Sequence, residues 1–139
     1  MKLRLILFNI IVLLPSLVFG QLKSFDCKRI KTGSFYFYPP AQQKGYLIIR
    51  DNATQKEINL QTGDTSFWKI KWQNACTATL SFLRKSQAIS EEELSFFNSH
   101  KTVIQILSVT KDYYIFKGGL DNTITSNITD TLWFKKRTW

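Results

Sequence analysis

The chain has 139 residues, of which 19 are Lys or Arg and 10 are Asp or Glu, so its formal charge is +9. This length favours a single domain, and the basic charge favours anionic partners such as nucleic acid, acidic lipid or acidic glycan without specifying a fold. With 1 histidine and 2 cysteines, the chain has too few ligands for a typical Cys/His zinc cluster.

The N-terminus has the residue order of a secretory signal peptide. A basic start precedes an apolar run at 5–14, and the small residues Val18 and Gly20 stand at the positions that define a cleavage site. The run is shorter than the about 20 residues that a membrane-spanning helix needs. We therefore expect 1–20 to be a signal peptide, 21–139 to be one domain without a transmembrane segment, and the protein to be secreted or periplasmic.

Both cysteines, Cys27 and Cys76, fall in the part of the chain that would be exported. An even number of cysteines in an oxidising compartment is typical of structural disulfides. We expect a Cys27–Cys76 bridge that ties the N-terminal arm to the middle of the chain and stabilises the fold by roughly 4 kcal/mol.

Period-two alternation is the main secondary-structure signal. Trp68, Ile70 and Trp72 share one face of a predicted strand, whereas Lys69 and Lys71 share the other. A tight turn then leads into a second alternating segment, which predicts a hairpin. Similar patterns rich in β-branched and aromatic residues predict about eight strands, at 34–38, 46–50, 55–60, 68–72, 76–82, 103–109, 113–117 and 131–135.

One segment departs from the β pattern and predicts a short helix near 90–98. Ser90 and Glu93 have the spacing of a capping box, and Leu94 and Phe97 follow at helical spacing. The acidic residues of the first turn suit the positive end of the helix dipole.

The connections between the expected strands are mostly short, so consecutive strands should be antiparallel neighbours. An antiparallel meander of about eight strands can remove its edges by closing on itself, and we expect a small, lipocalin-like barrel with the helix at one end. Such a barrel encloses either a packed interior or room for one small ligand. Bulky inward candidates such as Trp68, Trp72 and Phe82 favour the packed interior.

A set of short motifs resembles those of a known family: Gly-x-Phe at Gly33 after Cys27, Ile-x-Arg at Arg50, Gln-x-Glu at Glu57, and a Trp before Cys76. On these motifs the chain resembles a family of short secreted bacterial proteins of unknown function. Some members carry a topoisomerase-related label, but this chain has no ATP-binding loop. The segment at 33–36 also resembles the Gly-x-Trp signature of lipocalins, with Phe for Trp. This resemblance implies a calycin-type barrel and no particular ligand.

Few residues of the chain could support catalysis. There is no Gly-x-Ser-x-Gly elbow, and His100 is expected at a helix end near solvent without an orienting partner. Glu91, Glu92 and Glu93 occupy consecutive helix positions, so their side chains diverge and cannot converge on one cation. We therefore expect no enzymatic activity, no cofactor and no metal site.

Two kinds of partner suit an exported basic barrel. One is a small apolar molecule in the barrel mouth, for which the candidate binding residues are Tyr36, Trp68, Trp72 and Tyr114. The other is an anionic cell-surface polymer on the basic segments at 28–31, 84–85 and 135–137.

Nucleic acid is not an expected partner, because export separates the protein from it and because Trp and Lys alternate on opposite faces of the 68–72 strand. A different possibility is a structural or protein-interaction module with a fully packed core. An interior cavity would favour ligand binding over such a module.

Overall fold

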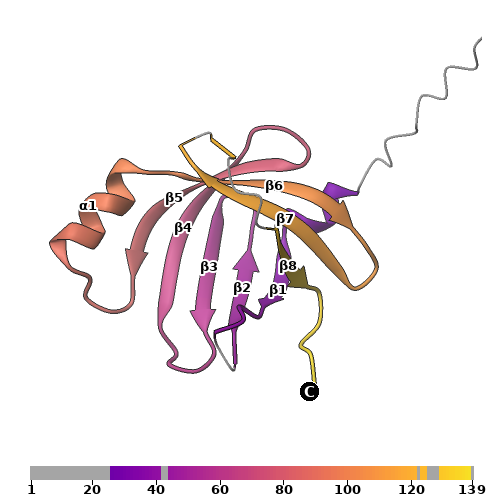
Figure 1. Ribbon diagram of the computed structural model, residues 1–139, viewed down its shortest axis with the longest axis horizontal. Helices are drawn as coiled ribbons and strands as arrows, with labels where there is room; N and C mark the ends of the chain where they lie inside the picture. The colour runs from indigo at the N-terminus through magenta and orange to yellow at the C-terminus, as the bar shows by residue number, and fades with distance from the viewer. Residues whose placement is uncertain (1–25, 42–43, 122, 125–128, 139) are drawn as a thin grey trace, which may run out of the picture.

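The computed structural model of the chain describes residues 26–41, 44–121, 123–124 and 129–138. In it, the strands predicted from the alternation form a closed barrel. Each strand pairs with the next in antiparallel fashion, and β1 also pairs with β8, which closes the sheet (Figure 1). The all-β class, the meander of eight strands, the barrel and the single short α-helix are therefore confirmed. The elements are η1 (Cys27–Ile30), β1 (Gly33–Phe37), β2 (Tyr46–Arg50), β3 (Thr54–Asn59), β4 (Thr65–Trp72), β5 (Thr77–Lys85), α1 (Glu91–Ser99), β6 (Thr102–Val109), β7 (Tyr113–Leu120) and β8 (Thr129–Trp133).

Several boundaries differ from the predicted ones. β4 begins at Thr65 rather than at 68, because its first residues are polar but still pair with both β3 and β5. β8 lies two residues earlier than predicted. The 3-10 helix η1 was not predicted, because its sequence carries no helix-start signal and tertiary contacts hold it in place.

The predicted signal peptide at 1–20 lies outside the described residues and stays a prediction. Within the described segments, none of the helices is long and apolar enough to span a membrane.

The helix α1 begins where the capping box predicts. The Oγ atom of Ser90 accepts a hydrogen bond from the backbone N–H of Glu93 at 3.1 Å, which satisfies one of the free donors at the helix start. Phe97 stacks on Phe82 of β5 with ring centroids 4.7 Å apart and meets Trp68 of β4 edge to face. These contacts seat α1 against the end of the sheet formed by β4 and β5.

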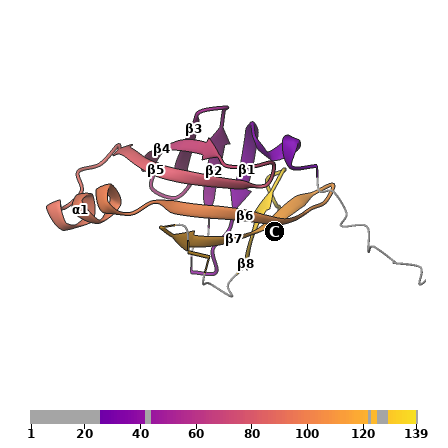
Figure 2. The same ribbon diagram turned by 90° about the horizontal axis from the view of Figure 1, so that it is seen from above.

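The two ends of the barrel differ, and Figure 2 shows η1 and α1 at opposite ends. At the end that we call closed, the Cys27–Cys76 disulfide fastens η1 to the β4–β5 turn, which confirms the predicted bridge. The other end, which we call open, receives the β3–β4 connection and the two connections of α1. The apolar core cluster next to η1 is made of Cys27, Ile30, Phe35, Ile48, Ile106, Tyr114 and Leu132.

Opening the disulfide should release η1 from the β4–β5 turn. We expect the double variant Cys27→Ser/Cys76→Ser to lose about 2–4 kcal/mol of unfolding free energy, because its unfolded chain is no longer cross-linked. Urea unfolding of residues 21–139, followed by tryptophan fluorescence, measures this loss. A reducing agent should lower the midpoint of the wild-type protein and leave that of the double variant unchanged. Equal midpoints for the oxidised wild-type protein and the double variant would contradict the stabilising role of the bridge.

Candidate functional site

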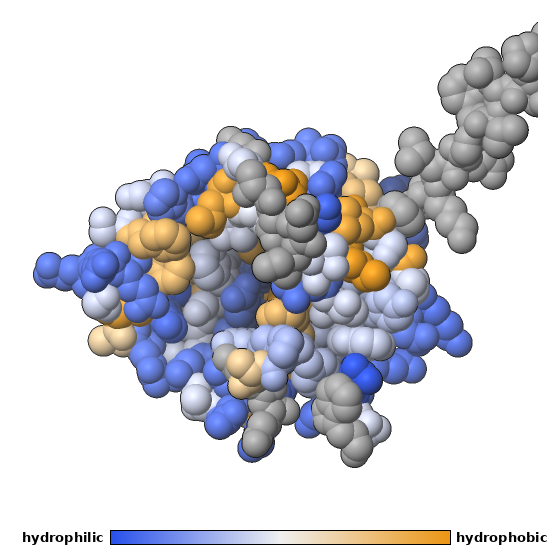
Figure 3. Space-filling model, viewed as in Figure 1, coloured by the Kyte–Doolittle hydropathy of each residue, from blue (hydrophilic) through white to orange (hydrophobic). Residues whose placement is uncertain are grey.

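A cavity of about 420 Å³ occupies the barrel interior, and the face of the molecule in Figure 3 is hollowed near its centre. The expectation of a packed interior therefore holds only in part, since the closed end is packed and space remains beyond it. Half of the lining side chains are apolar or aromatic, namely Phe37, Tyr46, Ile48, Leu80, Ile104, Tyr114, Phe116 and Leu132. The other half are polar, namely Arg50, Gln55, Glu57, Asn59, Asp64, Ser66, Lys85 and Thr102.

The polar wall arises from the inward face of β3. Side chains alternate along a strand, so Gln55, Glu57 and Asn59 share one face, and all three line the cavity. Polar side chains at these inward positions do not fill the interior as large apolar side chains would. The cavity is the space that they leave.

A buried arginine organises this wall from the closed end. Arg50 is only 3% exposed, and its Nη1 atom donates to the backbone carbonyl of Ile30 in η1 at 2.7 Å. Its Nε and Nη2 atoms both donate to the Oε1 atom of Gln55, at 2.8 and 2.6 Å. The guanidinium lies near the rings of Phe35 and Trp72. Arg50 is thus held in place by hydrogen bonds to η1 and β3.

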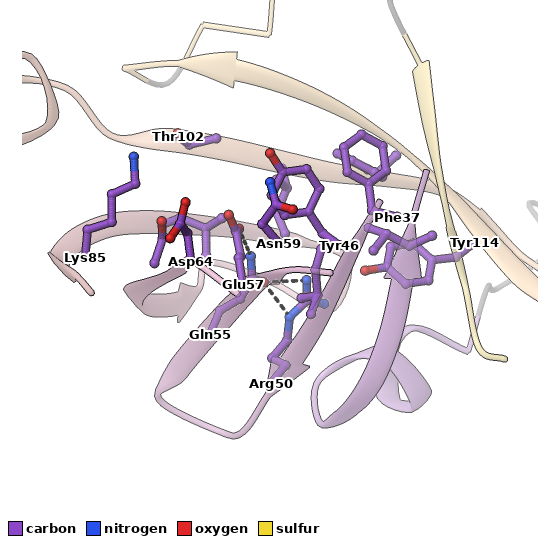
Figure 4. Close-up of a pocket in the computed structure, with 16 residues that line it drawn as sticks. Phe37, Tyr46, Arg50, Gln55, Glu57, Asn59, Asp64, Lys85, Thr102 and Tyr114 are labelled. Carbon is purple, nitrogen blue, oxygen red and sulfur yellow. Dashed lines mark hydrogen bonds between the residues drawn. The ribbon is translucent and has the colours of Figure 1, made fainter. Parts of the chain in front are cut away.

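The hydrogen bonds continue from Gln55 to Glu57 (Figure 4). With its Oε1 atom occupied by Arg50, Gln55 presents its Nε2 atom to the Oε1 atom of Glu57 and donates to it at 2.7 Å. The direction of this chain is fixed, because a guanidinium can only donate. The carboxyl group of Glu57 is therefore positioned at the edge of the cavity.

Burial raises the pKa of Glu57 above its ordinary value of 4.5. The hydrogen bond from Gln55, the indole N–H of Trp68 and the positive charge of Arg50 act in the opposite direction and offset part of this effect. Glu57 nevertheless keeps some accessible surface, because it borders the cavity. It is a carboxyl group deep in the protein that faces open space.

Three buried donors have no hydrogen bond of standard geometry among the described residues: the indole nitrogens of Trp68 and Trp72 and the hydroxyl of Tyr114. The indole N–H of Trp68 nevertheless lies close enough to Glu57 to lower its pKa. Burial also raises the pKa of Tyr114, and the nearby guanidinium of Arg50 opposes that shift. Unsatisfied donors are costly inside a protein. They add to the polar character of the interior.

At the open end the cavity is bordered by residues from three strands. Lys85, at the end of β5, forms an ion pair with Glu93 of α1 at 3.4 Å. Asn59 uses its Oδ1 atom to accept the backbone N–H groups of the next turn, the nearer at 2.8 Å. Asp64 and Thr102 line the same region. The lysine at this end is therefore already paired.

One of the four ligand-binding residues suggested by the sequence, Tyr114, lines the cavity, whereas Tyr36, Trp68 and Trp72 do not. Trp68 and Trp72 do face inward, where they pack against a second core cluster that contains Ile70. Tyr36 alternates with inward-facing neighbours and so faces outward. The prediction that Trp and Lys of β4 lie on opposite faces agrees with the burial of Ile70 and the exposure of Lys69.

Sequence reasoning missed Arg50, Gln55 and Glu57 as site residues. A signal was present, because Ile48 is an apolar residue of β2 with the same parity as Arg50. If Ile48 faces inward, then Arg50 must do so too. The same reasoning across the β2–β3 hairpin places Gln55, the pairing partner of Arg50, on the inner face.

His100 has an orienting partner that the sequence did not reveal. Its Nδ1 atom contacts the Oδ2 atom of Asp121, whose Oδ1 atom accepts a hydrogen bond from the backbone N–H of Lys101 at 3.0 Å. The hydrogen bonds from His100 and Lys101 lower the pKa of Asp121 below its ordinary value of 3.8. The pair is largely exposed and does not line the cavity. It connects the end of α1 to the end of β7.

The three predicted basic segments do not form one continuous basic face. Arg84 and Lys85 point to opposite faces of β5, since Lys85 lines the cavity and Arg84 lies over the outward ring of Phe67, 3.7 Å from its centroid. Two other segments come together, because Arg29 of η1 lies over the ring of Phe134, next to the C-terminal basic residues. In the segments that the structure describes, no group of three or more His, Cys, Asp or Glu side chains could hold a metal ion.

Fold and cavity together define a small up-and-down β-barrel with a hollow interior. No family model matches the chain, and no curated protein matches it.

Replacing Arg50 should destabilise the fold. We expect Arg50→Met, which keeps the length of the side chain, to lose about 2–4 kcal/mol of unfolding free energy, because the Ile30 carbonyl and Gln55 lose their partner. The control is Lys69→Met on the exposed face of β4, for which the change should stay within about 0.5 kcal/mol. Chemical denaturation measures both values. Equal losses in the two variants would contradict the role assigned to the buried guanidinium.

Glu57→Gln should change the pH dependence of stability. Because the pKa of Glu57 is raised in the folded state, the folded protein holds a proton that the unfolded chain has released between pH 4.5 and the folded-state pKa. Wild-type stability therefore falls as the pH rises through this window, whereas a glutamine does not titrate.

We expect the stability of Glu57→Gln relative to wild type to rise from pH 4 to pH 7.5, by about 1.4 kcal/mol for each unit of the pKa shift. Thermal unfolding across this range, with Glu92→Gln on the exposed face of α1 as the control, measures the effect. A stability difference that does not vary with pH would contradict the burial of this carboxyl group.

Proposed function

We propose that this protein is a non-enzymatic binding protein that holds one small amphipathic molecule inside its barrel. The observation that carries the proposal is the cavity of about 420 Å³ with one apolar and one polar group of lining residues. Ligand pockets commonly have volumes of about 300–1,000 Å³, with a few placed polar groups among apolar ones. The cavity falls within that volume range, and its lining combines eight apolar or aromatic side chains with eight polar ones.

The size of the cavity supports a binding role over a packing defect. Protein interiors are close-packed, and voids larger than a water molecule are few. Here the closed end is stabilised by the disulfide, by the apolar cluster beside η1 and by Arg50. A rigid closed end allows the rest of the interior to stay hollow and preorganised.

The proposed place of action is outside the cytoplasm, in the periplasm or the surrounding medium. The Cys27–Cys76 disulfide supports an oxidising compartment. The signal-like residues at 1–20 support export through a membrane.

A second candidate function is attachment to an anionic surface polymer through the outer face of β3–β5. Phe67 lies on this face between Lys56 and Arg84, which approach its ring from the two neighbouring strands. Lys69 is exposed on the same face. Such a basic face would attract polyanions, and it leaves the cavity free for a different ligand.

The cavity can be tested with a neutral fluorescent probe, N-phenyl-1-naphthylamine, whose emission rises in apolar surroundings. We expect one probe molecule to bind per chain of residues 21–139. Ser66→Trp, at a cavity-lining position of β4, should fill part of the space and weaken binding by about tenfold or more, equivalent to about 1.4 kcal/mol. Fluorescence titration measures both the affinity and the stoichiometry.

The matched control is Ser81→Trp, which places the same side chain on the outward face of the neighbouring strand β5 and should change the affinity less than about twofold. Circular dichroism verifies that both variants keep the barrel. A lack of probe binding to the wild-type protein, or equal weakening by the two variants, would overturn the proposed function.

A further inference from the structure

We propose that the cavity selects an amphipathic amine, whose protonated nitrogen binds the carboxylate of Glu57 while its apolar body packs on Ile104, Phe116 and Leu132. This inference rests on the proposed function, which assigns a small amphipathic ligand to the same cavity.

The position of Glu57 favours a ligand that donates hydrogen bonds. Glu57 lies in the middle of β3, where the hydrogen bond from Gln55 occupies its Oε1 atom and Gln55 is held in turn by Arg50. A carboxylate has two oxygens and accepts more than one hydrogen bond. Figure 4 shows this carboxyl group extending beyond Gln55 toward Asn59. The indole N–H of Trp68 acts on the same carboxyl group but makes no hydrogen bond of standard geometry with it. A ligand that donates N–H groups would therefore add a hydrogen bond to the carboxylate and offset the cost of its burial.

The two cationic side chains that line the cavity, Arg50 and Lys85, already have partners within the protein. The guanidinium of Arg50 is directed to Ile30 and Gln55 and is almost fully buried. The ammonium group of Lys85 is paired with Glu93. Both cations that line the cavity are thus already engaged, whereas the carboxyl groups of Glu57 and Asp64 border the open space. The partners of Arg50 are neutral, so its positive charge persists and acts on Glu57, but its three nitrogens already donate hydrogen bonds. Glu57 and Asp64 are the acidic groups that a cationic ligand would meet in the cavity.

The aromatic side chains of the lining also favour a cationic ligand. Phe37, Tyr46, Tyr114 and Phe116 all border the cavity. The face of an aromatic ring carries partial negative charge and attracts a cation within about 6 Å of its centroid. The rings therefore suit both the ammonium group and the apolar part of such a ligand.

Strands β2, β5 and β6 supply lining residues of both kinds, but the inward face of β3 is wholly polar and the lining residues of β7 and β8 are apolar or aromatic. Ile104, Phe116 and Leu132 belong to β6, β7 and β8, whereas Gln55, Glu57 and Asn59 all belong to β3. A ligand with its polar group at one end and a hydrocarbon body at the other can satisfy both walls at once. A molecule that is polar throughout cannot.

Octylamine, octan-1-ol and octanoate test the inference, because they share a chain length and differ in the head group. Each competes with N-phenyl-1-naphthylamine for the cavity at neutral pH, where the amine is a cation and the acid an anion. We expect octylamine to bind about tenfold or more tightly than the other two. Glu57→Gln should remove this preference by weakening octylamine binding about tenfold while leaving octan-1-ol within about twofold.

Glu92→Gln is the matched control, because it removes one carboxylate from the exposed face of α1, and it should keep the preference for the amine. Octan-1-ol or octanoate binding as tightly as octylamine would overturn the inference and leave the proposed function standing. The inference is likewise overturned if the probe binds but octylamine does not displace it, or if the amine preference survives in Glu57→Gln. Failure of the probe itself to bind would overturn the proposed function, and the inference with it.

Discussion

The burial of one positive charge at the closed end is the constraint on which the interior of this barrel depends. A guanidinium inside a protein is costly unless its N–H groups find acceptors. Arg50 finds them in the carbonyl of Ile30 and the side chain of Gln55. The first contact joins η1 to the barrel, and the second directs the amide of Gln55 toward Glu57. A single charge therefore fixes both the element that closes one end and the orientation of the polar groups that border the cavity.

The stabilising contacts and the cavity lie toward different ends of the barrel. The closed end holds the disulfide and the larger apolar cluster. Burial of apolar surface there stabilises the folded state by about 25 cal/mol for every square ångström removed from water. Toward the open end the interior contains the cavity instead of packed apolar side chains, and burial raises the pKa of the Glu57 carboxyl group that borders it. Residues that lower stability without an evident structural gain are often found where a protein binds its ligand. Glu57 fits the proposed binding role, because its burial raises the pKa of a carboxyl group that borders the cavity.

The architecture could be predicted from the sequence to a larger extent than the site. Alternation along 68–72, short connections and the capping box at Ser90 are local signals, and they determine the strands, the meander and α1. The disulfide followed from the number of cysteines and the signs of export. The cavity was beyond such reasoning, because it depends on which side chains meet across a closed barrel. The sequence suggested four aromatic candidates, of which Tyr114 lines the cavity, whereas Trp68 and Trp72 pack into the wall. Arg50 and Glu57 are charged, so their residue types favour solvent. The alternation from Ile48 and the register of β2 and β3 place them inside.

The most direct test of this account is a crystal structure of residues 21–139 in complex with octylamine. The account predicts electron density for one molecule inside the barrel, with its nitrogen within hydrogen-bonding distance of a carboxylate oxygen of Glu57 and its chain along Phe116 and Leu132. Octylamine bound only on the outer face, or an interior in which side chains fill the cavity, would contradict it.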